Sequence, residues 1–464
     1  MRVRLNKNAF VRIWESHSYI ENQVSHLVRT YTGAESHVVA SLSRGFQDVE
    51  EIVAASGEAE EFVTAFIREL ERLWMVVVAC DDSPSEADEH DFSYSQLEKI
   101  DELFTDTADT LMEPETPWLR SLTVEVTSLC NEKCVHCYLP GSKRYKGGKM
   151  PLDKVKSLID EYAAMNGLRI VFSGGEVLIH PDIFEIMEYS REKDLMVILQ
   201  SNILMLDDEK IRRLKELRLF NLQVSLYSTD ENVHDSVTGI KGSWKKTSGN
   251  IRKLVDSDIP LMISCPLMKP NYQGYRSMID YCKSLNVFCY VDYILMAQSD
   301  LCTENLSIRL NDAEMSELMD EMLECSPSYL ESLKALKTEA DLETVAFAQR
   351  FRNCSVLKNS LGIQVNGTAY PCPGWQHMVL GNIYDDTLSY IWHEAPQTTR
   401  LRGVKPSDFA HCSDCDRHNY CDMCMVYNYN ENNGDIYNVC KSFCKSAAML
   451  KAKVRDKFNS MNKV

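Results

Sequence analysis

The sequence lacks three features, and each absence excludes a class of protein. No apolar run approaches the roughly 18 residues that a membrane-spanning helix requires, so no membrane span is predicted. An excess of basic charge is also missing. The 68 acidic residues outnumber the 50 basic ones and give a net charge of -18, which argues against a protein that coats nucleic acid or anionic lipid. The first residues, Met1 to Lys7, contain no apolar signal core, so a cytoplasmic location is predicted.

The remaining composition is that of a folded protein with several domains. Of the 464 residues, 44% are hydrophobic and 25% are charged. At roughly 100 to 200 residues per domain, this length predicts two to four domains. Residues 81–117 hold 13 Asp or Glu and a single Lys, so we interpret them as an acidic linker with one helix in its second half.

The segment ahead of this linker, residues 1–80, has the pattern of a small winged-helix domain. Its predicted last helix carries more Glu than Arg, so nucleic-acid recognition is not expected. Strands are predicted at 9–14, 24–31 and 75–79, and helices at 35–42, 49–55 and 58–74.

Residues 118–330 alternate apolar strands with amphipathic helices. Such repetition gives an α/β fold with a parallel sheet, whose functional groups lie at the carboxyl ends of the strands. Six units, where a closed barrel has eight, predict a partial (β/α)6 TIM barrel. The predicted strands are 122–126, 169–172, 195–199, 222–226, 261–264 and 287–291.

Seventeen cysteines are many for a reduced compartment, and eleven of them fall into two groups, 130–137 and 354–444. Disulfide-rich domains are small and secreted, so metal ligation is the better interpretation of these groups. The other six cysteines, which stand singly among apolar residues, are interpreted as buried hydrophobic side chains: Cys80, Cys265, Cys282, Cys289, Cys302 and Cys325.

The first group, Cys130-Asn-Glu-Lys-Cys134-Val-His-Cys137, directly follows the first barrel strand. Three thiolates on such a loop can hold three corners of a metal cluster and leave a fourth metal atom open. A closed zinc site is the alternative, but it needs a fourth ligand, and His136 lies between two of the cysteines, where it reaches the same metal only with strain.

The CxxxCxxC motif after the first strand of a partial barrel resembles the radical SAM superfamily. This resemblance implies that Cys130, Cys134 and Cys137 ligate a [4Fe-4S] cluster whose open iron binds S-adenosylmethionine, with His136 near the adenine. One electron from the cluster then cleaves S-adenosylmethionine to a 5′-deoxyadenosyl radical, and a flavodoxin- or ferredoxin-type protein supplies that electron.

A second motif supports the resemblance. Gly174-Gly175-Glu176 follows the second strand, where the family's GGE motif contacts the methionine amino group of the cofactor. Asn202 and Ser225 stand at strand ends where family members contact the ribose or the carboxylate, although simple capping of a strand end is an equal alternative for both.

The C-terminal residues 331–464 resemble the SPASM extension of radical SAM enzymes, which holds two auxiliary iron-sulfur clusters. The resemblance implies two sets of ligands: Cys412, Cys415, Cys421 and Cys440 on an outer cluster, and Cys354, Cys372 and Cys424 on an inner one. Paired zinc ribbons are the alternative, because CxxC pairs suit zinc equally well.

Two details depart from the family pattern. Two residues rather than three separate Cys421 from Cys424, and there are two terminal cysteines, Cys440 and Cys444, rather than one. We predict from the sequence that Cys444 is not an essential ligand and that the inner cluster keeps an exchangeable site.

SPASM enzymes mostly act on peptides or proteins, and the order of elements in residues 1–80 resembles the PqqD-like element that binds the leader of a ribosomal precursor peptide. An extended leader would add as a strand to a sheet edge beside a helix groove. The chain is thus predicted to abstract a hydrogen from the precursor and form a Cys thioether, as sactipeptide and ranthipeptide synthases do. We expect peptide recognition and chemistry to be separable, so that removing residues 1–80 leaves cleavage of S-adenosylmethionine largely intact and abolishes modification of the precursor.

Three alternatives remain. Carbon–carbon cross-linking, as in streptide-type enzymes, is the nearest. Sulfatase maturases carry an acidic base after the cysteine that corresponds to Cys372, where this chain has Pro373, and they lack a leader-binding module. A zinc-stabilised winged-helix regulator leaves Gly174-Gly175-Glu176 and the six strand-helix units unexplained.

Overall fold

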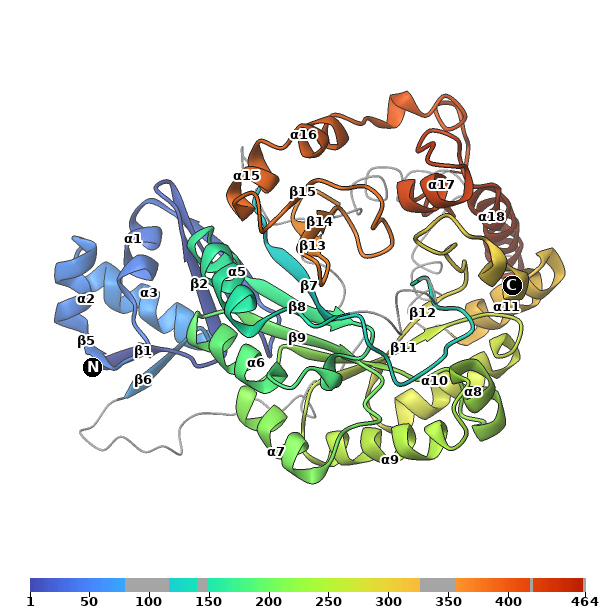
Figure 1. Ribbon diagram of the computed structural model, residues 1–464. Coiled ribbons are helices and arrows are strands. Elements are labelled where there is room, and N and C mark those ends of the chain that lie inside the picture. The colour runs from blue at the N-terminus through green and yellow to red at the C-terminus, as the bar shows by residue number, and fades with distance from the viewer. Residues whose placement is uncertain (80–116, 140–147, 326–355, 418–419, 462–464) are drawn as a thin grey trace.

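A computed structural model describes residues 1–79, 117–139, 148–325, 356–417 and 420–461. The chain forms an N-terminal module, a central barrel and a C-terminal region that curves over the open side of the barrel (Figure 1). Apart from Pro117, the predicted acidic linker lies outside the described residues. No helix of the described part has both the length and the apolar character needed to cross a bilayer.

The six predicted barrel strands are present, and all are parallel. They stand in the order β12-β11-β10-β9-β8-β7, so each strand pairs with its neighbour in the sequence. The partial barrel predicted from the sequence is therefore confirmed. Its strands are β7 (Ser121–Thr127), β8 (Arg169–Gly174), β9 (Met196–Ser201), β10 (Asn221–Ser225), β11 (Leu261–Pro266) and β12 (Phe288–Asp292).

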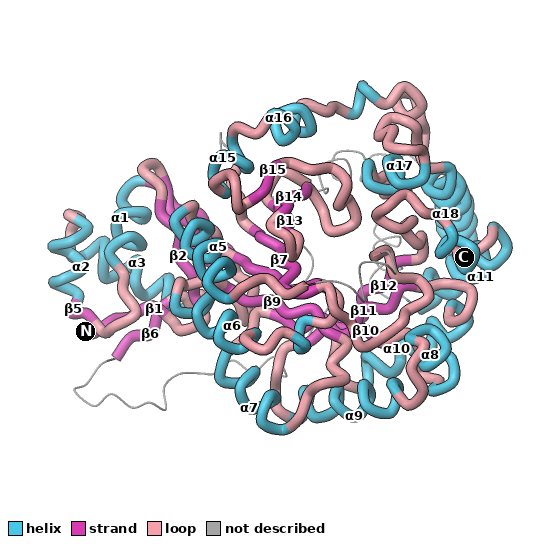
Figure 2. The backbone as a smooth tube through the Cα atoms, viewed as in Figure 1, coloured by secondary structure: helices cyan, strands magenta, loops and turns pink. Residues whose placement is uncertain are grey.

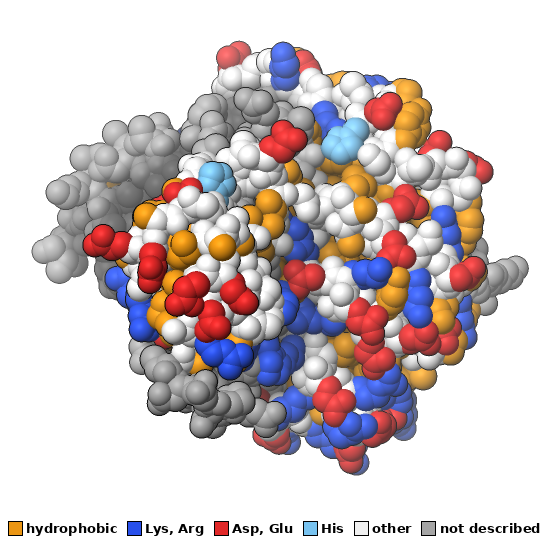
Figure 3. Space-filling view, turned by 90° about the vertical axis from the view of Figure 1, so that its left-hand side faces the viewer, with side chains coloured by type: hydrophobic (Ala, Val, Ile, Leu, Met, Phe, Trp, Pro, Cys, Tyr) orange, Lys and Arg blue, Asp and Glu red, His pale blue; other side chains and the backbone are white. Residues whose placement is uncertain are grey.

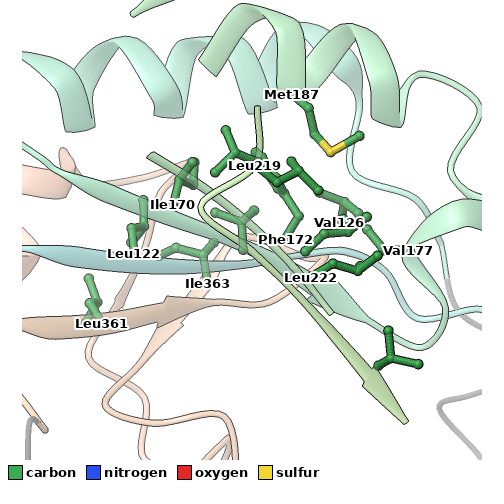
Figure 4. Packing of buried hydrophobic residues seen from close by; sticks show 14 of the residues in the cluster. Leu122, Val126, Ile170, Phe172, Val177, Met187, Leu219, Leu222, Leu361 and Ile363 are labelled. Carbon is green, nitrogen blue, oxygen red and sulfur yellow. The ribbon is translucent and has the colours of Figure 1, made fainter. Parts of the chain in front are cut away.

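Helices cover the outer face of this sheet (Figure 2). Leu122, Ile170 and Phe172 point from the strands into the layer between sheet and helices, where Met187 of the helical layer meets them (Figure 4). Because outward-facing positions are apolar, polar side chains on the other face are left to line the barrel interior. The helices are α5 (Leu152–Ala164), α6 (Ile183–Glu192), α7 (Asp208–Leu217), α8 (Glu231–Thr238), α9 (Ser243–Asp256), α10 (Tyr275–Ser284) and α11 (Asp312–Cys325).

The C-terminal region extends the barrel sheet. β13 (Ser360–Ile363) pairs in parallel with β7, and β14 (Thr368–Tyr370) and β15 (Gly381–Asn382) follow antiparallel. This pairing fixes the segment that carries Cys372 beside the strand that leads into Cys130. The helices of this region are α15 (Leu388–His393), α16 (Pro396–Arg402), α17 (Met425–Glu431) and α18 (Lys441–Met461).

The N-terminal module has the three predicted helices and more strands than predicted. The predicted strand 24–31 is wrong in its first half, because a turn occupies residues 23–27 between two strands of a hairpin. The module consists of two three-stranded sheets, β2-β3-β4 and β5-β1-β6, with three helices. Its elements are β1 (Arg2–Leu5), β2 (Ala9–Ile13), β3 (His17–Asn22), β4 (Val28–Thr32), α1 (Gly33–Ser41), β5 (Gln47–Asp48), α2 (Val49–Ser56), α3 (Glu60–Arg72) and β6 (Val76–Ala79).

Buried charges join this module to the amino ends of the barrel strands. Glu21 of β3 is 1% exposed and pairs with Arg169 and, at 3.6 Å, with Arg120. Burial alone would raise the pKa of Glu21, but the two arginines lower it below its ordinary value. Breaking a buried pair of this kind costs roughly 3–5 kcal/mol because the remaining charge stays buried.

Apolar packing reinforces the same junction. Tyr19 and Phe10 of the module form one buried cluster with Leu168 and Met196, which lead into barrel strands β8 and β9. The module therefore shares a buried apolar cluster with the barrel. On the face of the molecule that carries the module, acidic and hydrophobic side chains are interspersed (Figure 3).

Candidate active site at the carboxyl ends of the barrel strands

The loop after β7 carries the first cysteine group and is fixed by backbone hydrogen bonds. The amides of Lys133 and Val135 donate to Thr238 at 2.8 Å and Val237 at 3.0 Å, both in α8. The loop thus takes its position from an element about a hundred residues away in the sequence. Cys130, Cys134 and Cys137 are all partly buried in it.

The three thiols lie close enough to affect one another electrostatically. The pKa of Cys130 is raised to about 11, chiefly by burial; Glu176, Glu132 and Cys137 add to the rise, and one backbone hydrogen bond opposes it. Burial also raises the pKa of Cys134, with Glu132 and Cys137 as additional causes. Such a group of thiols becomes anionic only beside a strong positive charge, which is the charge that a bound iron cluster supplies.

No three His, Cys, Asp or Glu side chains of the described residues are arranged to hold a single metal ion. In a four-iron cluster, each thiolate binds a different iron atom, so the sulfur atoms do not need to meet at one point. The three thiols therefore fit a cluster.

The two glycines after β8 allow the cysteine loop to approach. The amides of Gly175 and Glu176 donate to the Thr127 and Leu129 carbonyls at 2.8 and 2.7 Å. A Cβ at Gly174 would overlap Thr127 O, and one at Gly175 would overlap Leu129 O. Gly174 also has a φ of 136°, which residues with a side chain rarely adopt. The close approach expected at these glycines is therefore made to the loop's own backbone.

Glu176 is buried and already holds three donors. Its Oε1 accepts from Leu178 N at 3.0 Å and Ser201 Oγ at 2.7 Å, and its Oε2 accepts from Asn202 N at 2.8 Å. Burial raises the pKa of this carboxyl group, while the three hydrogen bonds oppose the rise. Glu176 thus orders the ends of β8 and β9 around the cysteine loop.

Asn202 connects Glu176 and its hydrogen-bond partners to the cysteine loop. Its Nδ2 donates to Asn131 Oδ1 at 2.7 Å, one residue after Cys130. The structure thus brings Asn202, Glu176 and the first cysteine group together, as the sequence predicted. The binding roles predicted for them remain predictions.

Tyr227, which the sequence analysis did not single out, lies near two of the predicted site residues, His136 and Ser225. The Tyr227 ring lies 4.8 Å from the His136 ring, and its hydroxyl is 3.8 Å from Cys134 Sγ. Burial raises the pKa of Tyr227 well above its ordinary value, and Ser225, at the end of β10, opposes that rise. The two-residue spacing from Ser225 was the available signal, since it places both side chains on one side of an extended chain.

A second set of residues missed from the sequence lies in the barrel interior. Glu125 of β7 is 6% exposed and accepts from Tyr370 Oη at 2.9 Å and Gln376 Nε2 at 2.7 Å. Both donors flank Cys372. Tyr138, next to Cys137, interacts electrostatically with Glu125, Cys137 and Cys372. These polar side chains connect the first cysteine group with the segment that carries Cys372. A lone glutamate within an apolar strand was the signal.

Of the cysteines predicted for the auxiliary clusters, Cys354 lies outside the described residues. Cys372 is partly buried, and Cys424 precedes α17, where its carbonyl accepts from Asn428 N at 3.1 Å. After burial itself, Cys444 and Cys415 are the causes that raise the pKa of Cys412. Burial raises the pKa of Cys421 to about 11, with Cys444 and Cys412 among the further causes.

Cys440 has different neighbours. Its thiol donates to Glu431 Oε2 at 3.3 Å, and Glu431 forms an ion pair with Arg309 at 2.7 Å. Among the described residues, Cys444 packs with Cys412 and interacts electrostatically with Cys415 and Cys421, where the sequence had predicted Cys440. The ligand sets remain predictions, and these contacts favour Cys444 for the outer one.

Two family models match the chain. One described as "Radical SAM superfamily" covers residues 124–282, and one described as "Iron-sulfur cluster-binding domain", the SPASM model, covers residues 354–416. The first spans the strands from β7 into α10, including the cysteine loop and Gly174-Gly175-Glu176. The second begins at Cys354 and ends just after Cys415.

Curated relatives of two kinds are similar to the chain. The AdoMet-dependent heme synthase of Methanosarcina barkeri is 25% identical over 323 residues, which are 67% of this chain and 92% of that protein. The antilisterial bacteriocin subtilosin biosynthesis protein AlbA of Bacillus subtilis is 26% identical over 335 residues, 70% of this chain and 71% of AlbA.

Among solved structures, Streptococcus suis SuiB bound to the precursor peptide SuiA matches with a TM-score of 0.60 and 14% identity, covering 93% of this chain and 97% of that one. The uncovered part is too short to hold the whole N-terminal module, so the likeness of fold includes part of it. The chain therefore combines a radical SAM domain with a SPASM domain, and its cofactors are S-adenosylmethionine, the [4Fe-4S] cluster that binds it and auxiliary iron-sulfur clusters.

Proposed function

We propose that this protein modifies a ribosomally made precursor peptide and forms a Cys thioether within it. One observation carries the proposal: the likeness to SuiB, a structure solved with its precursor peptide, extends over 93% of this chain and into the N-terminal module. AlbA, a relative named for bacteriocin biosynthesis, supports the same class of substrate.

In this proposal, the chain consists of a leader-binding domain (1–80), an acidic linker (81–117), a radical SAM barrel (118–330) and a SPASM domain (331–464). Cys130, Cys134 and Cys137 hold the cluster that binds S-adenosylmethionine. Glu176, Asn202 and Ser225 order its binding site, together with His136 and the two glycines. The auxiliary ligands are Cys412, Cys415, Cys421 and Cys444 on the outer cluster, and Cys354, Cys372 and Cys424 on the inner one.

The bound cofactors supply a 5′-deoxyadenosyl radical that removes a hydrogen atom from a peptide carbon. Thioether formation then joins this carbon to a thiol sulfur of the peptide. The thiol proton would leave to solvent, and an auxiliary cluster held by the SPASM cysteines would accept the remaining electron. The peptide thus loses two hydrogen atoms in total, and an external flavodoxin- or ferredoxin-type donor supplies the electron that starts each turnover.

The N-terminal module offers a place for the leader. β4 is an outer strand of the β2-β3-β4 sheet in the described residues. Phe66 of α3 packs edge-on against Tyr31 of β4, with ring centroids 5.0 Å apart, and Phe62, which is 36% exposed, stacks on Phe66. An extended leader can pair with the free edge of β4 and place apolar side chains against Phe62.

A second function, heme synthesis, is favoured by the curated relatives. The Methanosarcina heme synthase aligns over 92% of its own length. The alignment leaves about a third of this chain uncovered, however, so heme synthesis alone would leave that part of the chain without a role.

The experiment compares both substrates. Anaerobically reconstituted protein receives S-adenosylmethionine, a reductant and either a peptide from a short Cys-containing reading frame beside its gene or Fe-coproporphyrin III. We expect mass spectrometry to show a peptide lighter by two hydrogens per ring, with no change in the porphyrin. Heme formation with an unaltered peptide would contradict the proposal. The same mass loss in a Cys-free peptide variant would indicate a carbon–carbon link.

A further inference from the structure

Tyr227 packs against Cys134 of the first cysteine group, and the proposed function gives it no role. It follows β10 by two residues, is 5% exposed and belongs to a small buried cluster with Val237, Met268 and Leu295, against which Cys134 packs. The Tyr227 hydroxyl lies 3.8 Å from Cys134 Sγ, within hydrogen-bond distance for sulfur.

The ring is held by two histidines, so the hydroxyl has a defined direction. His136 meets it edge-on at 4.8 Å between centroids, and His234 stacks on it at 5.5 Å. The backbone is fixed as well: Tyr227 N donates to His234 Nδ1 at 3.2 Å, and Tyr227 O accepts from Asn271 Nδ2 at 2.8 Å. A side chain held in this way loses little conformational freedom when it makes a hydrogen bond.

The direction of the hydrogen bond follows from the chemistry of the sulfur. The protonated Cys134 thiol donates to Glu132 Oε2 at 3.2 Å. A cysteine sulfur bound to iron has no proton, so it can only accept. The Tyr227 hydroxyl is then the donor.

We propose that Tyr227 is a positioning residue that tunes the reduction potential of the S-adenosylmethionine cluster by donating a hydrogen bond to Cys134 Sγ. A hydrogen bond to a cluster sulfur stabilises the reduced form, which carries the additional negative charge, and so favours the uptake of the electron that starts the reaction. The inference rests on the proposed ligand role of Cys134, but not on the identity of the substrate.

The test is a redox titration of the full-length reconstituted protein, followed by electron paramagnetic resonance. The cluster with the open iron is identified as the signal that changes when S-adenosylmethionine is added. Tyr227→Phe keeps the ring and removes only the hydroxyl. We expect its ratio of reduced to oxidised cluster at a fixed potential to fall about threefold, the effect of a hydrogen bond worth somewhat less than 1 kcal/mol.

Two further proteins make the result decisive. Replacing Tyr227 by 3,5-difluorotyrosine strengthens the donor and should shift the ratio toward the reduced form. Tyr189→Phe, which removes a hydroxyl bound to Asp160 on the outer helices, should leave it unchanged. An unchanged ratio in both Tyr227 proteins, or shifts in the same direction, would overturn the inference. A Cys134→Ala protein that still holds this cluster would instead show that the ligand proposal is wrong.

Discussion

Cys440 and Cys444 are only four residues apart, yet their thiols have different surroundings. α18 begins at Lys441, so Cys440 precedes the helix and Cys444 lies in its first turn. Cys440 is 3% exposed, its amide is bound by Asn428 Oδ1 at 2.9 Å, and its thiol faces Glu431. Cys444 packs instead in the cluster of Phe409 and Cys412.

This difference reverses the prediction that was made from the sequence. In our proposal, Cys444 supplies a thiolate to the outer cluster. We therefore expect the Cys444→Ala protein to lose about a third of the roughly 12 iron atoms that three [4Fe-4S] clusters hold. Cys440→Ala is the matched control on the same segment and should keep its iron. Iron analysis of the anaerobically reconstituted variants measures both. Full iron in Cys444→Ala with a loss in Cys440→Ala would restore the sequence-based assignment.

Among the elements, the turn after β8 and the cysteine loop after β7 depend on each other. β7 and β8 pair in register from Ser121 and Arg169 onward, and the register shifts between Glu125 and Thr127, where the loop leaves the sheet. The backbone of Gly175 and Glu176 then hydrogen-bonds the backbone of Thr127 and Leu129 at the start of the loop. The motif is thus explained by contact between two backbones, in addition to any contact with a cofactor.

Gly175→Ala tests this contact. The new methyl group would overlap the Leu129 carbonyl oxygen, so the cysteine loop must move. We expect a loss of about 1–3 kcal/mol in stability, typical of overpacking, and a reduced iron content.

Gly249→Ala in α9 is the control for this variant, because a Cβ there meets open space, and alanine favours the helix. Urea unfolding and iron analysis compare the two proteins. Equal stability and iron content in both would show that the loop accommodates the methyl group.

At the scale of the whole molecule, the N-terminal module and the barrel share a buried junction. Removing residues 1–80 would expose Leu168 and Met196 and leave Arg169 without Glu21. A truncated chain would therefore report on barrel stability as well as on peptide recognition. Point variants on the module's outer side separate the two effects.

Phe62→Glu is the variant of choice for the leader. A carboxylate in place of the exposed ring should weaken leader binding about tenfold or more, because an apolar anchor is lost and a charge must be desolvated. Fluorescence anisotropy with a labelled leader peptide measures the affinity.

Tyr390→Glu, at a residue 39% exposed on α15, is the matched control and should bind as the unmodified protein does. Equal affinities of both variants would remove α3 from the leader-binding surface.

The sequence by itself determined the features that depend on local patterns. Apolar runs such as Leu122–Val126 predicted the six strands to within one or two residues, because burial on a sheet is a property of neighbouring positions. The spacing of Cys130, Cys134 and Cys137 located the first cysteine group for the same reason: all three lie on one loop.

The tertiary structure alone decided which distant side chains meet. Cys444 rather than Cys440 lies beside Cys412, Tyr227 reaches Cys134 across 93 residues, and Glu21 pairs with Arg169 across 148. Such contacts depend on where whole elements pack against each other. Several arrangements satisfy the same hydrophobic pattern, and only the packed structure selects one of them.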